Sequence, residues 1–382
     1  MNMNTKFLFI VLLLCVLLVL LGSIIENRDL LITIRNTVCY YRVNDLGDYN
    51  ASSLPLMDIF YDVATEYNNF FKRIDNIKAQ HHIDFLCFES LNNIDYMIRN
   101  IGIPYSQRPK WVYGLNGSDN MASKRILANM MQNNGASHLI PETYITNSYD
   151  HMQYFIRDND PSTVYILKKD IQRQEGIFIS SNMEEIMKVH SEYVVIQKML
   201  QDPFIVGKRK INIRIYMLAI VRESGICEMY MYNDGFMYYT PKYWVPGTID
   251  KDINVTTGYI DRQVYIDNPL TLRDLGQHIG DDKYDRLMGN LKRTFKELKR
   301  IYAPVLAASN MGVNGKTKFL IYGVDIAPSE TLDCKIMEIN KGPDLSYKDE
   351  RDKLVKYNMM RACLELVGMI PSSKHQTSFI KL

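Results

Sequence analysis

The sequence has few cysteines and almost no excess of charge of one sign. Its 382 residues include six cysteines, scattered and without a CxxC pair. This argues against a zinc site or a disulfide framework and favours reduced thiols. The 45 Lys and Arg residues oppose 43 Asp and Glu residues, which gives a net charge of +2. A protein dedicated to nucleic acid needs a basic face, and so weak a bias argues against one.

Internal repeats and low-complexity tracts are also absent, and the seven histidines suggest no catalytic cluster. What is present is the composition of a globular protein, with 47% hydrophobic and 23% charged residues. Such a chain can bury a large core, which excludes disorder throughout, collagen and coiled coil. Its length corresponds to roughly two to three domains.

One long hydrophobic run stands at the N-terminus. Residues 7–25 carry no charge, and as a helix they are long enough to cross roughly 30 Å of hydrocarbon. A cleaved signal peptide is the alternative, but its apolar region is usually shorter and ends in a small-x-small site. We therefore expect an uncleaved anchor and a single-pass membrane protein. Arg28 and Arg35 follow the run, which favours a cytosolic location for the C-terminal body.

The rest of the pattern mixes helices and strands. Apolar residues at helical spacing predict helices at 55–78, 118–134 and 284–302, the last with a basic outer face. β-branched and aromatic runs predict strands at 163–168, 193–197, 211–221, 226–232 and 318–327. The residues after Pro371 are expected to form a loose tail.

Polar residues alternate with isoleucines at residues 210–215, which read KINIRI. On a strand, alternate side chains share a face, so Lys210, Asn212 and Arg214 point one way and the isoleucines point into packing. Three polar groups on one face of an apolar strand are costly unless they meet a ligand or counter-charges. The alternative is a solvated face of an edge strand.

An expected hairpin brings two carboxylates and an amide together. Residues 321–325 (IYGVD) and 336–340 (IMEIN) flank a polar turn, and this spacing places Asp325 opposite Glu338. Asn340 then shares a face with Glu338. Such oxygen ligands suit Mg²⁺ with bound phosphates, because two unpaired carboxylates so close would repel without a cation. The alternative is a carboxylate pair neutralised by a lysine.

A third pattern is the pair Lys168 and Lys169, which ends an apolar strand and precedes a polar loop up to Gly176. A lysine at a strand end beneath a flexible loop can meet a nucleotide phosphate. A solvated lysine pair is the common alternative.

At these residues the chain resembles the tubulin–tyrosine ligase family, including its polyglutamylase and polyglycylase branches. The resemblance runs in order from about residue 110 to residue 369. It is carried by LIPETY (139–144), VYILK (164–168), VIQKML (195–200), GKRKINIRIY (207–216), YGVD (322–325) and MEINKGPDLS (337–346). It implies an α/β (α+β) fold of ATP-grasp architecture, with mixed and antiparallel sheets flanked by helices, here behind one N-terminal transmembrane helix.

The resemblance, together with the hydrophobic run at residues 7–25, gives a division of the chain and a set of partners. The expected segments are a membrane anchor with its tail (1–26), a membrane-proximal stretch with a small N-terminal α/β domain (27–110), a central ATP-grasp subdomain (111–195), a C-terminal ATP-grasp subdomain with the metal site (196–370) and a tail (371–382). The implied partners are a protein substrate, by family default a tubulin tail, and a free amino acid. No nucleic acid is expected, and the membrane is contacted through the N-terminal helix.

Roles are implied at the positions that match the family. The implied nucleotide site comprises Lys168, Gln197, Lys198, Met199, Leu200, Lys210, Asn212, Arg214, Thr256 and Thr257. Within it, Lys168 and Lys210 bind phosphates, and residues 197–200 form a hinge whose backbone reads the adenine edge. Lys210 and Arg214 are implied to be catalytic, with Arg214 binding phosphate or stabilising the transferring phosphoryl group. The implied Mg²⁺ ligands are Asp325, Glu338 and Asn340.

The implied activity is an ATP- and Mg²⁺-dependent ligation. A substrate carboxylate attacks the γ-phosphoryl group of ATP, an acylphosphate forms, and an amine displaces phosphate to make an amide bond. Phosphoryl transfer needs positioning and charge neutralisation more than a protein nucleophile, so lysines, an arginine and metal ligands suffice.

Several positions depart from the family pattern. The loop after Lys168 has one glycine (Gly176), Asn212 replaces an aspartate, Tyr238 or Tyr239 replaces an arginine that helps to bind the incoming amino acid, Thr257 replaces an asparagine, and Lys341 replaces a small residue. The alternative function is therefore a degenerate ATP-grasp protein that binds nucleotide or a partner without ligase activity.

Overall fold

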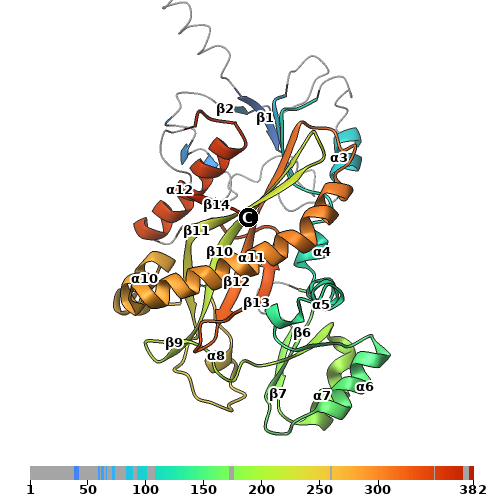
Figure 1. The fold of residues 1–382 in the computed structure, drawn as a ribbon, viewed down its shortest axis with the longest axis vertical. Coiled ribbons are helices and arrows are strands. Elements are labelled where there is room, and N and C mark those ends of the chain that lie inside the picture. Colours follow the sequence, from blue (N-terminus) through green and yellow to red (C-terminus); the bar gives the residue numbers. More distant parts are fainter. Residues whose placement is uncertain are drawn as a thin grey trace, which may run out of the picture.

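Two β-sheets flanked by helices make up the described part of the chain (Figure 1). The computed structural model describes residues 108–171, 176–258, 260–347, 349–372 and 378–382, with shorter segments at 38–42, 59–60, 62–63, 66, 71–73, 83–88 and 93–100. This arrangement confirms the expected mixed α/β fold class.

The larger sheet has the strand order β14-β11-β10-β12-β4-β3-β1-β2, with β13 on β12 and β9 on β10. Its strands are β1 (Val38–Arg42), β2 (Phe71–Arg73), β3 (Phe85–Cys87), β4 (Trp111–Tyr113), β9 (Ile205–Val206), β10 (Arg209–Arg222), β11 (Cys227–Tyr239), β12 (Thr317–Pro328), β13 (Cys334–Asn340) and β14 (Phe379–Lys381). The long strands β10, β11, β12 and β13 pair antiparallel, whereas β4 joins β12 in parallel.

The smaller sheet is antiparallel, with the order β5-β8-β6-β7. Its strands are β5 (Thr143–Ile145), β6 (Tyr165–Lys168), β7 (Ile177–Ser180) and β8 (Val195–Lys198). Helices α6 (Tyr149–Asp158) and α7 (Met183–Val189) cover one face of it (Figure 1). Phe155 of α6 and Ile186 of α7 are buried there against Tyr165 and Leu167 of β6. The opposite face of the smaller sheet, which carries Ile166 and Ile177, is turned towards strands β10, β12 and β13 of the larger sheet.

The remaining helices connect and cover the larger sheet. They are α3 (Ile94–Asn100), α4 (Asp119–Ala122), α5 (Lys124–Asn133), α8 (Lys251–Asn254), α9 (Arg262–Asp267), α10 (Leu272–Ile279), α11 (Asp281–Ser309) and α12 (Glu350–Leu366), with 3₁₀ turns η1 (Ser137–Leu139) and η2 (His190–Glu192).

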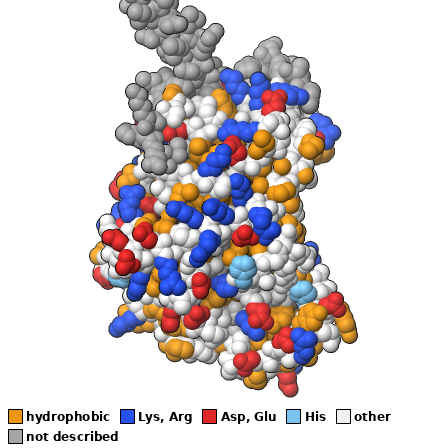
Figure 2. Space-filling view, in the orientation of Figure 1, with side chains coloured by type: hydrophobic (Ala, Val, Ile, Leu, Met, Phe, Trp, Pro, Cys, Tyr) orange, Lys and Arg blue, Asp and Glu red, His pale blue; other side chains and the backbone are white. Residues whose placement is uncertain are grey.

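Helix α11 confirms the amphipathic helix expected at 284–302. Leu287, Leu291, Phe295 and Leu298 are fully buried in the main core, one helical turn apart. Lysines and arginines lie on the outer side of α11. Figure 2 shows Lys and Arg side chains gathered over the middle of the face of the molecule on which α11 lies.

The strand expectations are confirmed with small shifts at the ends, except that the strand expected at 226–232 continues to Tyr239. The helix expected at 118–134 is present but divided, because Ser123 has an extended backbone and its Oγ caps α5 by accepting from the amide of Ile126. Gly135, just past the end, has a φ of 69°. A left-handed residue at this place is a common helix stop, and glycine adopts it without steric cost.

One expectation holds only in part, and another is wrong. Residues 59–60 and 62–63 of the helix expected at 55–78 are helical, but Phe71–Arg73 form a strand that pairs in parallel with β1. The expected loose tail after Pro371 instead ends in β14, which pairs antiparallel with Tyr230–Tyr232 of β11. In both cases the strand forms by pairing with another strand that lies elsewhere in the sequence, and the local spacing of apolar residues does not predict such a pairing.

The hairpin of β12 and β13 has the expected register at the site. Asp325 pairs with Glu338 and Gly323 with Asn340. A bulge follows between Asp325 and Ile326, so that the rest of the hairpin is shifted by one residue. The bulge lies on the turn side of the site and leaves the facing of Asp325 and Glu338 unchanged.

The transmembrane helix expected at residues 7–25 lies outside the described residues. Among the helices that the structure does describe, none combines the length and the apolar character needed to span a bilayer. This finding contradicts the prediction of a single-pass membrane protein, and we withdraw that localisation.

Candidate functional site

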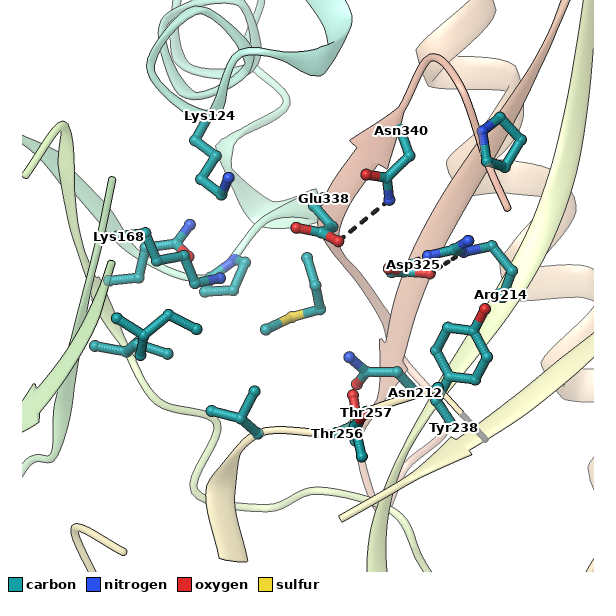
Figure 3. Close-up of a pocket in the computed structure, with 18 of the residues that line it drawn as sticks. Lys124, Lys168, Asn212, Arg214, Tyr238, Thr256, Thr257, Asp325, Glu338 and Asn340 are labelled. Atoms are coloured by element: carbon teal, nitrogen blue, oxygen red, sulfur yellow. Dashed lines mark hydrogen bonds and ion pairs between the residues drawn. The ribbon is translucent and has the colours of Figure 1, made fainter. Parts of the chain in front are cut away.

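A cavity of about 850 Å³ lies between the smaller sheet and strands β10, β12 and β13 (Figure 3). Every residue expected in the nucleotide and metal sites lines it, although these residues are spread over some 170 positions of the chain. They are Lys168, Gln197, Lys198, Met199, Leu200, Lys210, Asn212, Arg214, Thr256, Thr257, Asp325, Glu338 and Asn340. The fold therefore brings all the predicted residues to one place.

Strand β10 supplies the polar face that its alternation predicts. Lys210, Asn212 and Arg214 line the cavity, while Ile211 and Ile213 are fully buried on the other side. Strands β11 and β12 pair with β10 on its two sides, which excludes the alternative of an edge strand. The polar face is thus enclosed, and each polar group on it needs a partner.

Arg214 has its partner within the protein. It lies directly across from Asp325 in the register of β10 and β12, and both side chains are buried. The guanidinium donates twice to the carboxylate, from Nη2 to Oδ2 at 2.9 Å and from Nε to Oδ1. Such a two-pronged pair fixes orientation as well as charge. An arginine, rather than the lysine considered above, neutralises this carboxylate.

Tyr238 and Gly323 also surround the Arg214 side chain. The ring of Tyr238 lies 5.0 Å from the guanidinium carbon. A Cβ atom on Gly323 would lie only 3.0 Å from Cδ of Arg214 and from Cβ of Pro343. Any larger residue at position 323 would displace one of them, so the glycine permits this close approach.

Glu338 has no ion-pair partner among the described residues. It accepts a hydrogen bond of 3.2 Å from Nδ2 of Asn340 and faces Asp325 across the hairpin. Burial raises the pKa of Glu338, but the Asn340 hydrogen bond and the charge of Lys168 outweigh this and hold it below its usual value. Burial raises the pKa of Asp325 to about 6, against the opposing effect of Arg214.

The geometry leaves oxygen atoms for a cation at this place. No group of three or more His, Cys, Asp or Glu side chains among the described residues is placed to hold a metal ion. The donors here are two carboxylates and one amide oxygen, from Asp325, Glu338 and Asn340. Magnesium prefers this kind of donor and usually keeps some of its water. The charge of Glu338 is not neutralised by an ion pair among the described residues, so a hard divalent cation fits this set of donors.

Three lysines line the same cavity as these carboxylates. Burial lowers the pKa of Lys168 to about 8, partly offset by Glu338, and the pKa of Lys210 also to about 8, with a further decrease from Lys168. Lys124 lowers the pKa of Lys168 too, and its Nζ donates to the carbonyl of Ile171 at 3.0 Å. The charge of Lys124 thus acts on Lys168 and that of Lys168 on Lys210, so neighbouring amines lie close enough to act on one multiply charged anion.

An apolar slot lies at the end of the cavity beneath the smaller sheet. Ile166 and Met199 are buried there, with Ile177 and Val255 packed against them. The amide groups of Lys198 and Met199 donate to the carbonyls of Glu142 and Val164, both at 2.9 Å. These two amide groups are engaged within the fold, and the expected reading of the adenine edge by the backbone of residues 197–200 stays a prediction.

Sequence reasoning missed Lys124 and Asp344, which also line the cavity. One signal for Lys124 was available. It occupies the first turn of α5, where the helix dipole disfavours a positive charge, so its position needs another reason. Asp344 follows the metal-site hairpin, in a loop whose course local patterns do not reveal.

The departures from the family pattern also gather here. Tyr238 pairs with Asn212 in the register of β10 and β11, and both line the cavity. Lys341 lines it too and forms an ion pair with Asp119. Residues 172–175 of the glycine-poor loop lie outside the described residues.

Comparison with known proteins agrees with this site. The model of the tubulin-tyrosine ligase family matches residues 113–377. Tubulin glycylase 3B of Drosophila melanogaster is 23% identical over 224 residues, which cover 55% of this chain and 30% of the fly protein. The human tubulin polyglutamylase TTLL6 is 23% identical over 254 residues, or 60% of this chain and 27% of the human protein.

The probable alpha-tubulin polyglutamylase Ttll1 of Tetrahymena thermophila is 24% identical over 253 residues, 60% of each chain. The chain thus spans less than two thirds of the length of each of these relatives. The matched segment contains both sheets' contributions to the cavity, from Lys124 to Asp344. By the extent of this match and the residues it includes, the chain belongs to the tubulin-tyrosine ligase family.

Proposed function

We propose that this chain is an ATP- and Mg²⁺-dependent ligase that joins an amine, in the family an amino acid, to a carboxylate on a protein tail. One observation carries the proposal. Lys124, Lys168 and Lys210 line the same cavity as Asp325 and Glu338, and the charges of both carboxylates act on Lys168. This charge pattern is the one required to hold a nucleoside triphosphate with its metal.

In this proposal the chain's own residues position ATP. The slot of Ile166, Met199 and Val255 takes the base, because stacked aromatic rings favour apolar walls. The three lysines take the phosphates. Asp325, Glu338 and Asn340 would hold Mg²⁺, which when bound neutralises phosphate charge and orients the γ-phosphoryl group.

Ligation then needs two substitutions at different atoms. An acceptor carboxylate oxygen attacks the γ-phosphorus, the bond to the ADP oxygen breaks, and an acylphosphate forms. An amine nitrogen next attacks the acyl carbon, the carbon–oxygen bond to phosphate breaks, and an amide remains. Arg214 is held by Asp325 at the edge of this region and supplies positive charge as negative charge develops on the phosphoryl group.

A tubulin tail is the acceptor that the relatives suggest. Tubulin is the protein named in the descriptions of the fly, human and Tetrahymena relatives. Tubulin is accordingly the first acceptor to test with this chain.

A degenerate, non-ligating protein is the second candidate, and Arg214 is the observation that favours it. Its charge is already neutralised by Asp325, and Tyr238 packs on its guanidinium. In such a protein the cavity would bind nucleotide without turnover.

Ligation itself decides between the two. The protein is incubated with ATP, Mg²⁺, tubulin and a mixture of amino acids, and tubulin tails are analysed by mass spectrometry. We expect the mass of tubulin tails to increase by the mass of one or more amino-acid residues, with one ADP released for each residue added. ATP binding without ADP release or added mass would instead support the degenerate protein.

The lysine pKa values give a second test, the pH dependence of ATP binding. Because the pKa values of Lys168 and Lys210 are lowered to about 8, both lysines lose their charge as the pH rises through that value. ATP affinity, measured by calorimetry, should therefore fall by about tenfold or more from pH 7 to pH 9. ATP binding raises both pKa values, so protons are taken up on binding near pH 8.

The control is the double variant Lys168→Arg/Lys210→Arg. Arginine keeps its charge over this range, so the pH dependence should disappear in the variant. A wild-type affinity that is constant from pH 7 to pH 9 would exclude these lysines from the phosphate site.

A further inference from the structure

The lysine and arginine side chains that line the cavity differ in the exposure of their partners. Three of the lysines are assigned above to the phosphates. The other cations form ion pairs with carboxylates: Lys169 with Glu192, Lys198 with Glu142, Arg214 with Asp325, and Lys341 with Asp119. In the pair of Arg214 and Asp325 both side chains are buried, whereas the side chain of Asp119 is 51% exposed.

Lys341 lies next to the proposed metal site. It directly follows Asn340, the last residue of β13, and Figure 3 shows Asn340 beside Glu338, with a hydrogen bond between them. The Lys341 side chain is only 16% exposed and lines the cavity, while its partner Asp119 is the first residue of α4 and lies outside the cavity lining. Lys341 therefore brings a positive charge to the cavity wall, and water reaches the carboxylate that neutralises it.

A substrate anion can replace Asp119 at little cost. An ion pair with an exposed carboxylate is weak because water competes for the charge, and Asp119 is solvated once it is released. Taking Asp325 from Arg214 is strongly unfavourable, because it leaves a buried charge without a partner. Of these two cations, Lys341 is the one whose partner a substrate can replace.

The chemistry of this position favours a carboxylate as the incoming anion. A lysine ammonium is a compact point charge, and one carboxylate that replaces another leaves the charge balance at the ammonium unchanged. A polyphosphate has the three lysines assigned above. A ligase of the proposed kind has two substrates that carry carboxylates, the free amino acid and the acceptor.

We propose that Lys341 is a substrate-binding residue, at which a carboxylate of a substrate takes the place of Asp119. This inference rests on the proposed ligase function and adds a residue to its substrate site. The carboxylate is that of the free amino acid, or one of the acceptor other than the carboxylate that is activated. Both sources have the same chemistry, and separate KM values distinguish them.

Lys341→Gln removes the charge and keeps most of the length of the side chain. The full chain is supplied with ATP, Mg²⁺, tubulin and the amino acid that the wild type adds, and KM is measured for the amino acid and for tubulin in turn. We expect one of the two KM values to rise by about tenfold, and that value identifies the source of the carboxylate. The value of kcat should change little, because the contact is the same before and during the reaction. Lys341→Arg keeps the charge and should restore most of the lost affinity.

Asp119→Asn separates exchange from a purely structural role. It removes the carboxylate that competes for Lys341, so the same KM should fall by about two- to threefold, opposite to the effect of Lys341→Gln. If the ion pair only fastened β13 to α4, both variants would change KM in the same direction. Since Asp119 is half exposed, this variant also tests the proposal if Lys341→Gln does not fold.

Lys242→Gln is the matched control, because Lys242 forms an ion pair with Asp250 outside the cavity; both KM values should stay unchanged. Wild-type KM values in both Lys341→Gln and Asp119→Asn, or changes in the same direction, would overturn the assignment of Lys341 and leave the ligase intact. Absence of ADP release and of added mass with the wild type and a mixture of all amino acids would overturn the ligase and this inference with it.

Discussion

Glu338→Gln is expected to reduce ligation by roughly 10²-fold or more while leaving the fold intact. The substitution removes one charge and almost no volume. Glu338 is the carboxylate without an ion-pair partner in the described cavity, facing Asp325 and bonded to Asn340. Losing it removes a ligand for the cation that neutralises the transferring phosphoryl group. Turnover is measured as ADP release with tubulin and an amine.

Glu330→Gln is a matched control in the turn of the same hairpin. Glu330 is exposed and lies outside the cavity, so this variant should ligate at the wild-type rate. A second readout does not depend on activity: added Mg²⁺ with ATP should raise the melting temperature of the wild type more than that of Glu338→Gln. Ligation by Glu338→Gln at the wild-type rate would show that the metal assignment is wrong.

Arg214→Met is expected to destabilise the protein by about 3–5 kcal/mol, because it leaves the carboxylate of Asp325 buried without its cation. Both residues of the pair are less than a tenth exposed, so little water can take the place of the lost partner. Turnover should also fall by roughly 10²-fold, as expected on loss of a preorganised charge near the transferring group. Denaturant unfolding measures the first effect and ADP release the second.

The double variant Arg214→Met/Asp325→Asn separates charge from packing. Replacing both partners removes the unpaired charge, so most of the lost stability should return while turnover stays low. If Arg214→Met unfolds at the same denaturant concentration as the wild type, the buried pair contributes nothing and its placement is wrong.

Short-range patterns predicted much of the site. The alternation of Lys210, Asn212 and Arg214 with isoleucines predicted their shared face, because the two-residue period of a strand leaves no other arrangement. The pairing of Asp325 with Glu338 followed from the spacing across one short turn, and the bulge lies beyond it. Hairpin registers are local properties, and for this reason a single sequence contains them.

Features that depend on distant partners were not predicted. The pairing of Arg214 with Asp325 joins residues 111 positions apart and requires β10 and β12 to be neighbours. Strand β14 forms by pairing with the edge of β11. The strand Phe71–Arg73 forms by pairing with β1. Lys124 reaches the cavity only through the placement of α5. Each of these was determined by tertiary contacts that local spacing does not encode.

The central claim is that a carboxylate is activated by ATP in this cavity and then captured by an amine. Tubulin whose tail carboxylates carry ¹⁸O is incubated with the protein, ATP, Mg²⁺ and an amine, and the released phosphate is analysed by mass spectrometry. Ligation through an acylphosphate predicts one ¹⁸O atom in phosphate for each amide formed, because the carboxylate oxygen leaves with the phosphoryl group. Phosphate without ¹⁸O, or no phosphate at all, would contradict the account.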